Sequence, residues 1–198
     1  SSVLENVKIP VVAAGGFRDG SGLAASLAWG ACGIAMGTRF MMTQESPVPS
    51  KTKEAYLSAE VEEIKITKKF DGLSHRLIFN NYIKKIDRSN PLSLFIMSVS
   101  SAWKYKQITK ASFGDLFKSF FAMLKGDDLT ISQSIMSANS PAIIQKAMVE
   151  GAPHEGAMPS GQVAGIITNL PSCKELIDQI MREFGIAADN FKKIEGES

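Results

Sequence analysis

The sequence predicts an α/β fold, and three segments near its beginning carry that prediction. The apolar run Val11–Ala14, bounded by Pro10 and two glycines, is typical of a short strand buried on both faces. Ser21–Gly30 has leucines four residues apart and several alanines, which suits a short helix packed on a sheet. Gly33–Phe40 is a second apolar run. Strand, helix and strand in this order predict a right-handed βαβ unit.

Composition bounds the class of protein. The 198 residues suit one domain, or a domain with an appendage. The 22 basic and 20 acidic residues give no electrostatic footprint for nucleic acid and no polybasic membrane anchor. The apolar stretch Leu92–Trp103 is interrupted by serines and too short to cross a bilayer. The two cysteines are not in a ligand spacing, so we expect no metal site, no disulfide framework and a cytoplasmic location.

Residues 51–155 have a different texture, mainly helical with a short β element. Lys51–Glu63 contains good helix formers, and Glu63–Phe70 alternates apolar and polar residues as a half-buried strand does. Arg76–Tyr82 is either a partner strand or the start of a helix.

Three further helices are predicted from their start and stop signals. They are Ser112–Leu124, a helix from Ser140-Pro141 to Gly151, and a helix from a Ser172/Glu175 capping box to Gly185. The first is rich in phenylalanine, and it either packs on the rest of the chain, which we favour, or binds a partner or a membrane surface.

Glycines follow both predicted strands, where a ligand could approach the backbone. Gly15 and Gly16 come directly after the first strand, and the next helix would point its N-terminal N–H groups at the same place. The alternative is a plain tight turn. Gly37 ends the second strand, with the Thr38 hydroxyl beside it. Barrels often bind phosphate after their last two strands, so the pair predicts a phosphate site.

The segment IPVVAAGGFRDGSGLAASLAWGACGIAMGTRF, residues 9–40, resembles the seventh and eighth strands of the nitronate monooxygenase family, which also includes flavin-dependent enoyl-acyl-carrier-protein reductases. The similarity resumes at Thr67–Asn81 and Gly156–Ile177 and is weakest over Lys84–Ser137. The resemblance implies the C-terminal part of a (β/α)8 TIM barrel. Residues 1–50 would supply its last two strands, 51–155 a mainly helical lid or insert, and 156–198 a return to the barrel.

The resemblance also implies bound FMN. The residues expected near it are Gly15 and Gly16 in the first loop, Ala35, Met36, Gly37 and Thr38 at the second strand, and Gln162 of the Gly161-Gln162 pair in the lid. For Gln162 the alternative is a helix-start residue with only a local hydrogen bond.

The activity implied is oxidation of small alkyl nitronates by FMN and O2 to a carbonyl compound and nitrite. The alternative is FMN-dependent reduction of an enoyl thioester by NAD(P)H, and a second alternative is an inactive remnant or interaction module. We expect a small-molecule substrate, no nucleic-acid or membrane partner, and an upstream barrel half. The sequence leaves a homodimer open.

The family's catalytic histidine stands in a glycine-rich motif that this sequence lacks. His75 and His154 are not in that motif, so no catalytic residue is assigned to this chain. A complete barrel needs about 250 residues. We therefore expect a fragment that does not hold FMN tightly by itself, and stoichiometric flavin co-purifying with the isolated chain would contradict this.

Overall fold

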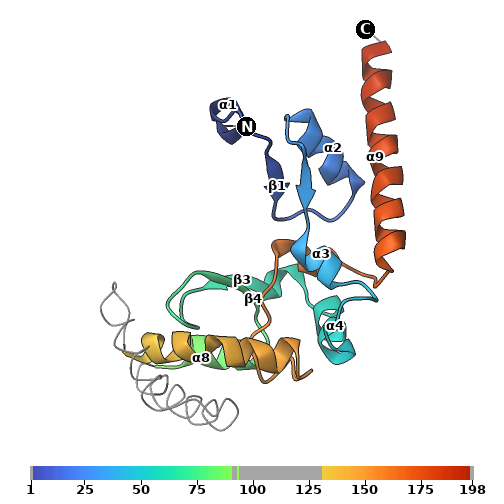
Figure 1. Ribbon diagram of the computed structural model, residues 1–198. Coiled ribbons are helices and arrows are strands. Elements are labelled where there is room, and N and C mark those ends of the chain that lie inside the picture. The colour runs from blue at the N-terminus through green and yellow to red at the C-terminus, as the bar shows by residue number, and fades with distance from the viewer. Residues whose placement is uncertain (1, 91–92, 94–130, 197–198) are drawn as a thin grey trace. The chain divides into compact units, whose positions relative to one another are not determined.

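The computed structural model describes residues 2–90, 93 and 131–196, so the predicted helix at 112–124 lies outside the described residues. Two compact units emerge, which Figure 1 draws in one view. Unit 1 comprises residues 1–47 and 161–198, and unit 2 comprises residues 48–160.

Unit 1 contains the βαβ unit. Its elements are α1 (Ser2–Asn6), β1 (Val12–Ala14), α2 (Gly20–Ala28), β2 (Gly33–Ala35), α3 (Gly37–Met41), the 3-10 helix η2 (Gln162–Ile166) and α9 (Cys173–Gly196). β1 and β2 pair in parallel, with Val12 opposite Gly33 and Ala14 opposite Ala35, as the sequence predicts. The crossover between them is α2.

Two predictions for these strands are wrong. The second strand does not run to Phe40 but ends at Ala35, because helix α3 begins at Gly37. This helix buries Arg39, and Met42, which directly follows the helix, is also buried. The strands are also not buried on both faces. Val12 is 57% exposed, since within the described residues β1 pairs only with β2.

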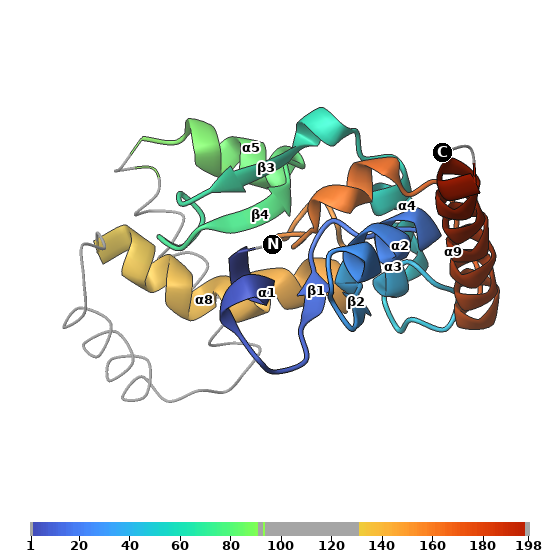
Figure 2. The same cartoon turned by 90° about the horizontal axis from the view of Figure 1, so that it is seen from above.

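Helices α2 and α9 lie side by side, although they are distant in sequence (Figures 1 and 2). A Cβ on Gly20 would come within 2.1 Å of the Ile180 carbonyl oxygen, so only glycine permits this approach. The predicted capping box starts α9, with the Ser172 N–H and hydroxyl both bonded to Glu175 at 2.8 Å. The predicted stop at Gly185 is wrong, because that glycine has helical backbone and the helix continues.

Unit 2 is built on an antiparallel hairpin. Its elements are α4 (Ser50–Leu57), the 3-10 helix η1 (Val61–Glu63), β3 (Ile64–Thr67), β4 (His75–Ile78), α5 (Asn81–Arg88) and α8 (Ile131–Met148). The segment predicted as either strand or helix is both, because Asn80 caps α5 two residues after β4 ends. Figure 2 shows β3 and β4 side by side.

The core of unit 2 is apolar. Its buried cluster comprises Phe70, Leu77, Phe79, Ile83, Ile86, Ile143 and Ala157. The segment before Gly161 joins the hairpin, since the Ile78 N–H donates to the Met158 carbonyl at 3.1 Å and the Ser160 N–H donates to the Arg76 carbonyl at 3.0 Å. The buried Asn80 amide donates to the Gly156 carbonyl and so ties this segment to α5 as well.

The start predicted for α8 is wrong. The helix begins at Ile131 and passes through Pro141, which has no N–H to give to the carbonyl of Ser137. The Ser140 hydroxyl donates to that carbonyl at 3.0 Å and replaces the missing bond. A proline that looks like a helix start can therefore lie inside a helix when a neighbouring side chain satisfies the released acceptor.

None of the helices in the described part of the chain combines the length and the apolar character needed to cross a membrane.

Candidate functional site: the strand-end loops of unit 1

Two loops leave the small parallel sheet at the same edge. Ala14 and Ala35 are register partners, so the residues that follow them, Gly15–Gly16 and Met36–Gly37, start from adjacent strand ends. Ligands of parallel α/β folds bind beyond this carboxyl edge. The two halves of the expected site therefore begin side by side.

The first loop depends on its glycines. Gly15 has φ of 97° and Gly16 has φ of 80°, a region that other residues rarely adopt. A Cβ at either position would meet no atom within 4 Å. The loop backbone is thus exposed, and its side of the sheet edge has room for a ligand.

The start of α2 differs from the expectation. The Gly22 N–H donates to the carboxylate of the N-cap residue Asp19 at 3.1 Å, and the Gly20 N–H donates to Glu183 of α9 at 2.8 Å. The prediction that this helix offers its first N–H groups to a phosphate is therefore wrong for Gly20 and Gly22. Two carboxylates already occupy these donors.

The start of α3 is open instead. Its N-cap, Met36, has extended backbone and makes no side-chain cap bond, and a Cβ on Gly37 would meet no atom within 4 Å. The first N–H groups of a helix have no partner within the helix. Ala35 and Gly37 are exposed, and Met36 and Thr38 are half-buried. Anion donors at this edge are therefore available from α3 and from the loop at Gly15–Gly16.

Thr38 connects the second loop to the Gly161-Gln162 pair. Its hydroxyl oxygen accepts the Gly161 N–H at 2.8 Å. Gln162 is the first residue of η2, and its exposed side chain makes no hydrogen bond to a described residue. The local bond considered as the alternative for Gln162 is thus not observed.

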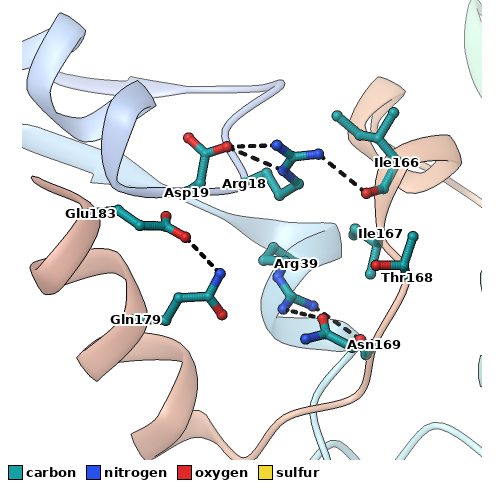
Figure 3. Close-up of a pocket in the computed structure, with 9 residues that line it drawn as sticks. All are labelled: Arg18, Asp19, Arg39, Ile166, Ile167, Thr168, Asn169, Gln179 and Glu183. Carbon is teal, nitrogen blue, oxygen red and sulfur yellow. Dashed lines mark hydrogen bonds and ion pairs between the residues drawn. The ribbon is translucent and has the colours of Figure 1, made fainter. Parts of the chain in front are cut away.

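Arg18 and Arg39 of unit 1 point towards η2 and the segment that follows it, as Figure 3 shows. Arg39 is only 3% exposed, and its guanidinium donates to the side-chain oxygen of Asn169 at 2.8 Å and to its carbonyl at 3.3 Å. Arg18 bonds Asp19 at 2.8 Å and the Ile166 carbonyl at 3.3 Å. These residues line a polar cavity of about 150 Å³.

The charges around this cavity are unevenly paired. Glu183 accepts the Gly20 N–H and the Gln179 amide, and Asp19 is paired with Arg18. Arg39 makes no ion pair with any described residue. Burial lowers the pKa of Arg39, and the nearby charge of Arg18 lowers it further. A buried cation without a carboxylate partner is costly, so its two bonds to Asn169 matter for the local structure.

The two histidines lie in unit 2. The His75 Nε2 is 2.9 Å from the buried carboxylate of Asp71, and its ring packs edge-on against Phe70. His75 is therefore a half-buried side chain at the start of β4. His154 is exposed and lines an open hollow beside α4.

Sequence reasoning missed the acceptors that surround α2 and α3. Asp19 stands three residues before Gly22, which is an N-cap spacing that could have been recognised. No sequence signal points to Glu183 or Asn169, because their partners lie more than 120 residues away.

The fold and the site define the class: an α/β protein whose two adjacent parallel strands end in open glycine loops. A family model described as nitronate monooxygenase matches residues 1–183. The chain belongs to the nitronate monooxygenase family, as the resemblance implied.

Curated relatives similar to this chain include carboxyl-CoA dehydrogenases and a probable nitronate monooxygenase. The chain is 44% identical over 194 residues to "(3aS,4S,5R,7aS)-5-hydroxy-7a-methyl-1-oxo-octahydro-1H-indene-4-carboxyl-CoA dehydrogenase" of Rhodococcus jostii, which covers 98% of this chain and 53% of the relative. A protein of the same name from Mycobacterium tuberculosis is 40% identical over 91% of this chain and 52% of its own length. A probable nitronate monooxygenase of Staphylococcus haemolyticus is 42% identical over 41% of this chain and 23% of its own length.

Two solved structures have folds similar to that of this chain. FabK from Thermotoga maritima matches with a TM-score of 0.65 and 27% identity, covering all of this chain and 50% of that one. Nitroalkane oxidase from Streptomyces ansochromogenes matches with a TM-score of 0.60 and 24% identity, covering 94% of this chain and 42% of that one, which speaks for the fold alone. The chain spans about half the length of the relatives that it matches.

Proposed function

We propose that this chain supplies the phosphate-binding part of a flavin site, with FMN as the cofactor, in an oxidoreductase built on a TIM barrel. The residues that would hold the phosphate are Gly15, Gly16, Ala35, Met36, Gly37 and Thr38. Gln162 would lie near the flavin. The observation that carries the proposal is the pair of open glycine loops at adjacent parallel strand ends.

The residues present fit a phosphate group. Backbone N–H groups at Gly15–Gly16 and at the start of α3 provide uncharged donors, and no Cβ blocks the approach. The Thr38 hydroxyl has a proton to give, because its recorded bond uses the oxygen as acceptor. The Asp19 carboxylate is paired with Arg18 and accepts the Gly22 N–H, and the Glu183 carboxylate accepts the Gly20 N–H and the Gln179 amide.

The chemical work is divided accordingly. A bound flavin supplies two-electron transfer. This chain's residues bind the phosphate and orient the cofactor, and none of them is assigned to move a substrate proton. His75 does not enter the proposal, because its ring is directed to the buried Asp71 carboxylate.

For the substrate, we propose an acyl-CoA thioester. The support is the extent of similarity: 98% of this chain matches a carboxyl-CoA dehydrogenase, against 41% for a probable nitronate monooxygenase. The match over 98% of the chain also includes residues 84–137, over which the resemblance to the nitronate monooxygenase family is weakest. On this proposal that segment is shared with relatives that act on a CoA ester.

Oxidation of alkyl nitronates by O2 is the second candidate, and the family model favours it. The two candidate activities differ in the substrate carbon that is oxidised and in the product that is released. Nitronate oxidation releases nitrite, whereas dehydrogenation of a CoA ester reduces the flavin without releasing nitrite.

The test uses a chimera in which these 198 residues replace the matched segment of the Rhodococcus jostii protein. We expect the chimera to purify with FMN, and its flavin band to bleach anaerobically with that relative's CoA ester. Nitrite release from an alkyl nitronate, without bleaching by the CoA ester, would favour the second candidate. A folded chimera that binds no flavin would contradict both and leave the remnant or interaction module.

Gly16→Val in the chimera tests the site itself. It places a β-branched side chain at a φ of 80°, so we expect FMN affinity to fall by at least tenfold. Gly185→Val is the matched control, since Gly185 has an ordinary φ and nothing near its Cβ position.

A further inference from the structure

Three side chains next to the phosphate loops each hold one part of the segment 161–169. Thr38 accepts the Gly161 N–H, Arg18 donates to the Ile166 carbonyl, and Arg39 donates to Asn169. We propose that Arg18, Thr38 and Arg39 form a clamp that positions Gln162 relative to the phosphate loops and couples phosphate binding to the order of this segment. The inference rests on the proposed flavin site.

The contacts fall at the beginning, middle and end of the segment. Gly161 precedes η2, Ile166 is its last residue, and Asn169 lies three residues beyond. Within the segment, Val163, Ala164 and Ile167 are buried, so apolar packing holds one side of it. The Gln162 side chain is exposed, so its position is set by the backbone to which it is attached. Fixing that backbone at three points fixes the position from which Gln162 extends.

Close packing makes the first contact specific. A Cβ on Gly161 would come within 2.9 Å of the Thr38 hydroxyl oxygen, so a larger residue would force the two apart. The Thr38 hydroxyl has one proton and two acceptor sites, and Gly161 uses one acceptor site. No described group accepts the proton. A phosphate oxygen that accepts it would hold the hydroxyl in the orientation that also receives the Gly161 N–H.

The last contact is the buried one. Arg39 is the next residue after Thr38, yet its guanidinium bonds Asn169 and makes no ion pair with a described residue. Arg39 is therefore a positioning residue, and it acts on the site through Asn169. Figure 3 shows both arginines directed towards the segment, and Gln179 and Glu183 on their other side.

Coupling of this kind is reciprocal. Whatever binds the phosphate loops more tightly when the clamp is formed must also stabilise the clamp. Loss of one hydrogen bond of this type changes an equilibrium by about tenfold.

The experiment measures hydrogen exchange of peptides covering residues 161–169 in the full chimera, without and with FMN, together with the FMN dissociation constant. We expect Arg39→Met and Thr38→Val to raise exchange of this segment about tenfold without FMN, and to weaken FMN binding several-fold. Arg39→Lys and Thr38→Ser should restore most of both properties. Arg182→Met, on the exposed side of α9, is the matched control and should change neither.

The outcomes separate the two proposals. If the unsubstituted chimera binds no FMN, the flavin site fails, whereas the exchange data without FMN still test the clamp. If FMN binds and Thr38→Val weakens it while exchange of 161–169 is unchanged in both variants, the clamp is wrong and Thr38 acts on the phosphate alone. If Arg39→Met raises exchange throughout the protein, Asn169→Ala, which removes only the side-chain acceptor, must raise it in 161–169 for the clamp to stand.

Discussion

The two compact units are stabilised by different kinds of contact. In unit 2, apolar side chains from the hairpin, α5 and α8 meet in one buried cluster. In unit 1, the strands are partly exposed, and distant segments are joined by a close glycine contact, caps and arginine bonds in addition to buried apolar residues such as Met42 and Leu176. The difference teaches that unit 1 depends on polar geometry close to the proposed site, whereas unit 2 depends on buried area. Four predictions test this contrast.

The largest effect should come from the core of unit 2. Leu77 on β4 is fully buried, so Leu77→Ala should lower the free energy of unfolding by about 2–5 kcal/mol. Ile66→Ala on the paired strand, where the side chain is 59% exposed, should cost below about 1 kcal/mol. Urea denaturation followed by circular dichroism measures both. Equal losses would show that this cluster does not carry unit 2.

In unit 1, the comparable position has no side chain. Gly20→Ala should separate α2 from α9 and cost about 1–3 kcal/mol, because the new Cβ would overlap backbone of α9. Gly185→Ala on α9 meets no neighbour and should stabilise by about 0.5–1 kcal/mol through helix propensity. Thermal unfolding should show shifts of opposite sign. A neutral Gly20→Ala would contradict the close packing.

The capping box of α9 should matter less. Ser172→Ala removes the hydroxyl that bonds Glu175 and its N–H, at a cost of about 1 kcal/mol. Ser21→Ala, on an exposed serine of α2, is the control and should cost less than about 0.5 kcal/mol. Hydrogen exchange in the first turn of α9 measures the effect, and unchanged protection would mean that packing alone starts the helix.

The smallest effect should come from Asp19. Burial raises the pKa of its carboxyl, but the bonds from Arg18, Gly22 and Ser21 together outweigh burial and lower it. A group whose folded pKa is depressed stabilises the protein above its unfolded pKa, about 3.9 for aspartate, and the stabilisation is lost as pH falls through the lower folded value.

Asp19→Asn should therefore be less stable than the unsubstituted protein at pH 7, and the difference should shrink below pH of about 4. The Asp19 side chain is half-buried and so still partly in solvent, and screening keeps the effect small. Unfolding measured against pH for both proteins tests this. If the difference in stability between the two proteins widens as pH falls, the pKa of Asp19 is not lowered in the folded protein.

The sequence by itself determined the local elements and the glycine loops. Parallel strands at residues 12–14 and 33–35, the strand after residue 63 and the capping box at Ser172 all follow from short-range patterns. Gly15 and Gly16 could be singled out because only glycine is comfortable at positive φ. Local sterics and local hydrogen bonds act over a few residues, so one stretch of sequence contains them.

Only the tertiary structure decided which donors at the sheet edge stay open. The sequence favoured the start of α2, but Glu183, distant in the chain, occupies the Gly20 N–H, and α3 replaces the end of the predicted second strand. Pro141 does not begin a helix, because the Ser140 hydroxyl satisfies the carbonyl that the proline cannot bond. Gly185 does not end a helix, because its backbone is helical. These outcomes depend on contacts between segments more than a hundred residues apart, or on competition between local signals, and packing settles both.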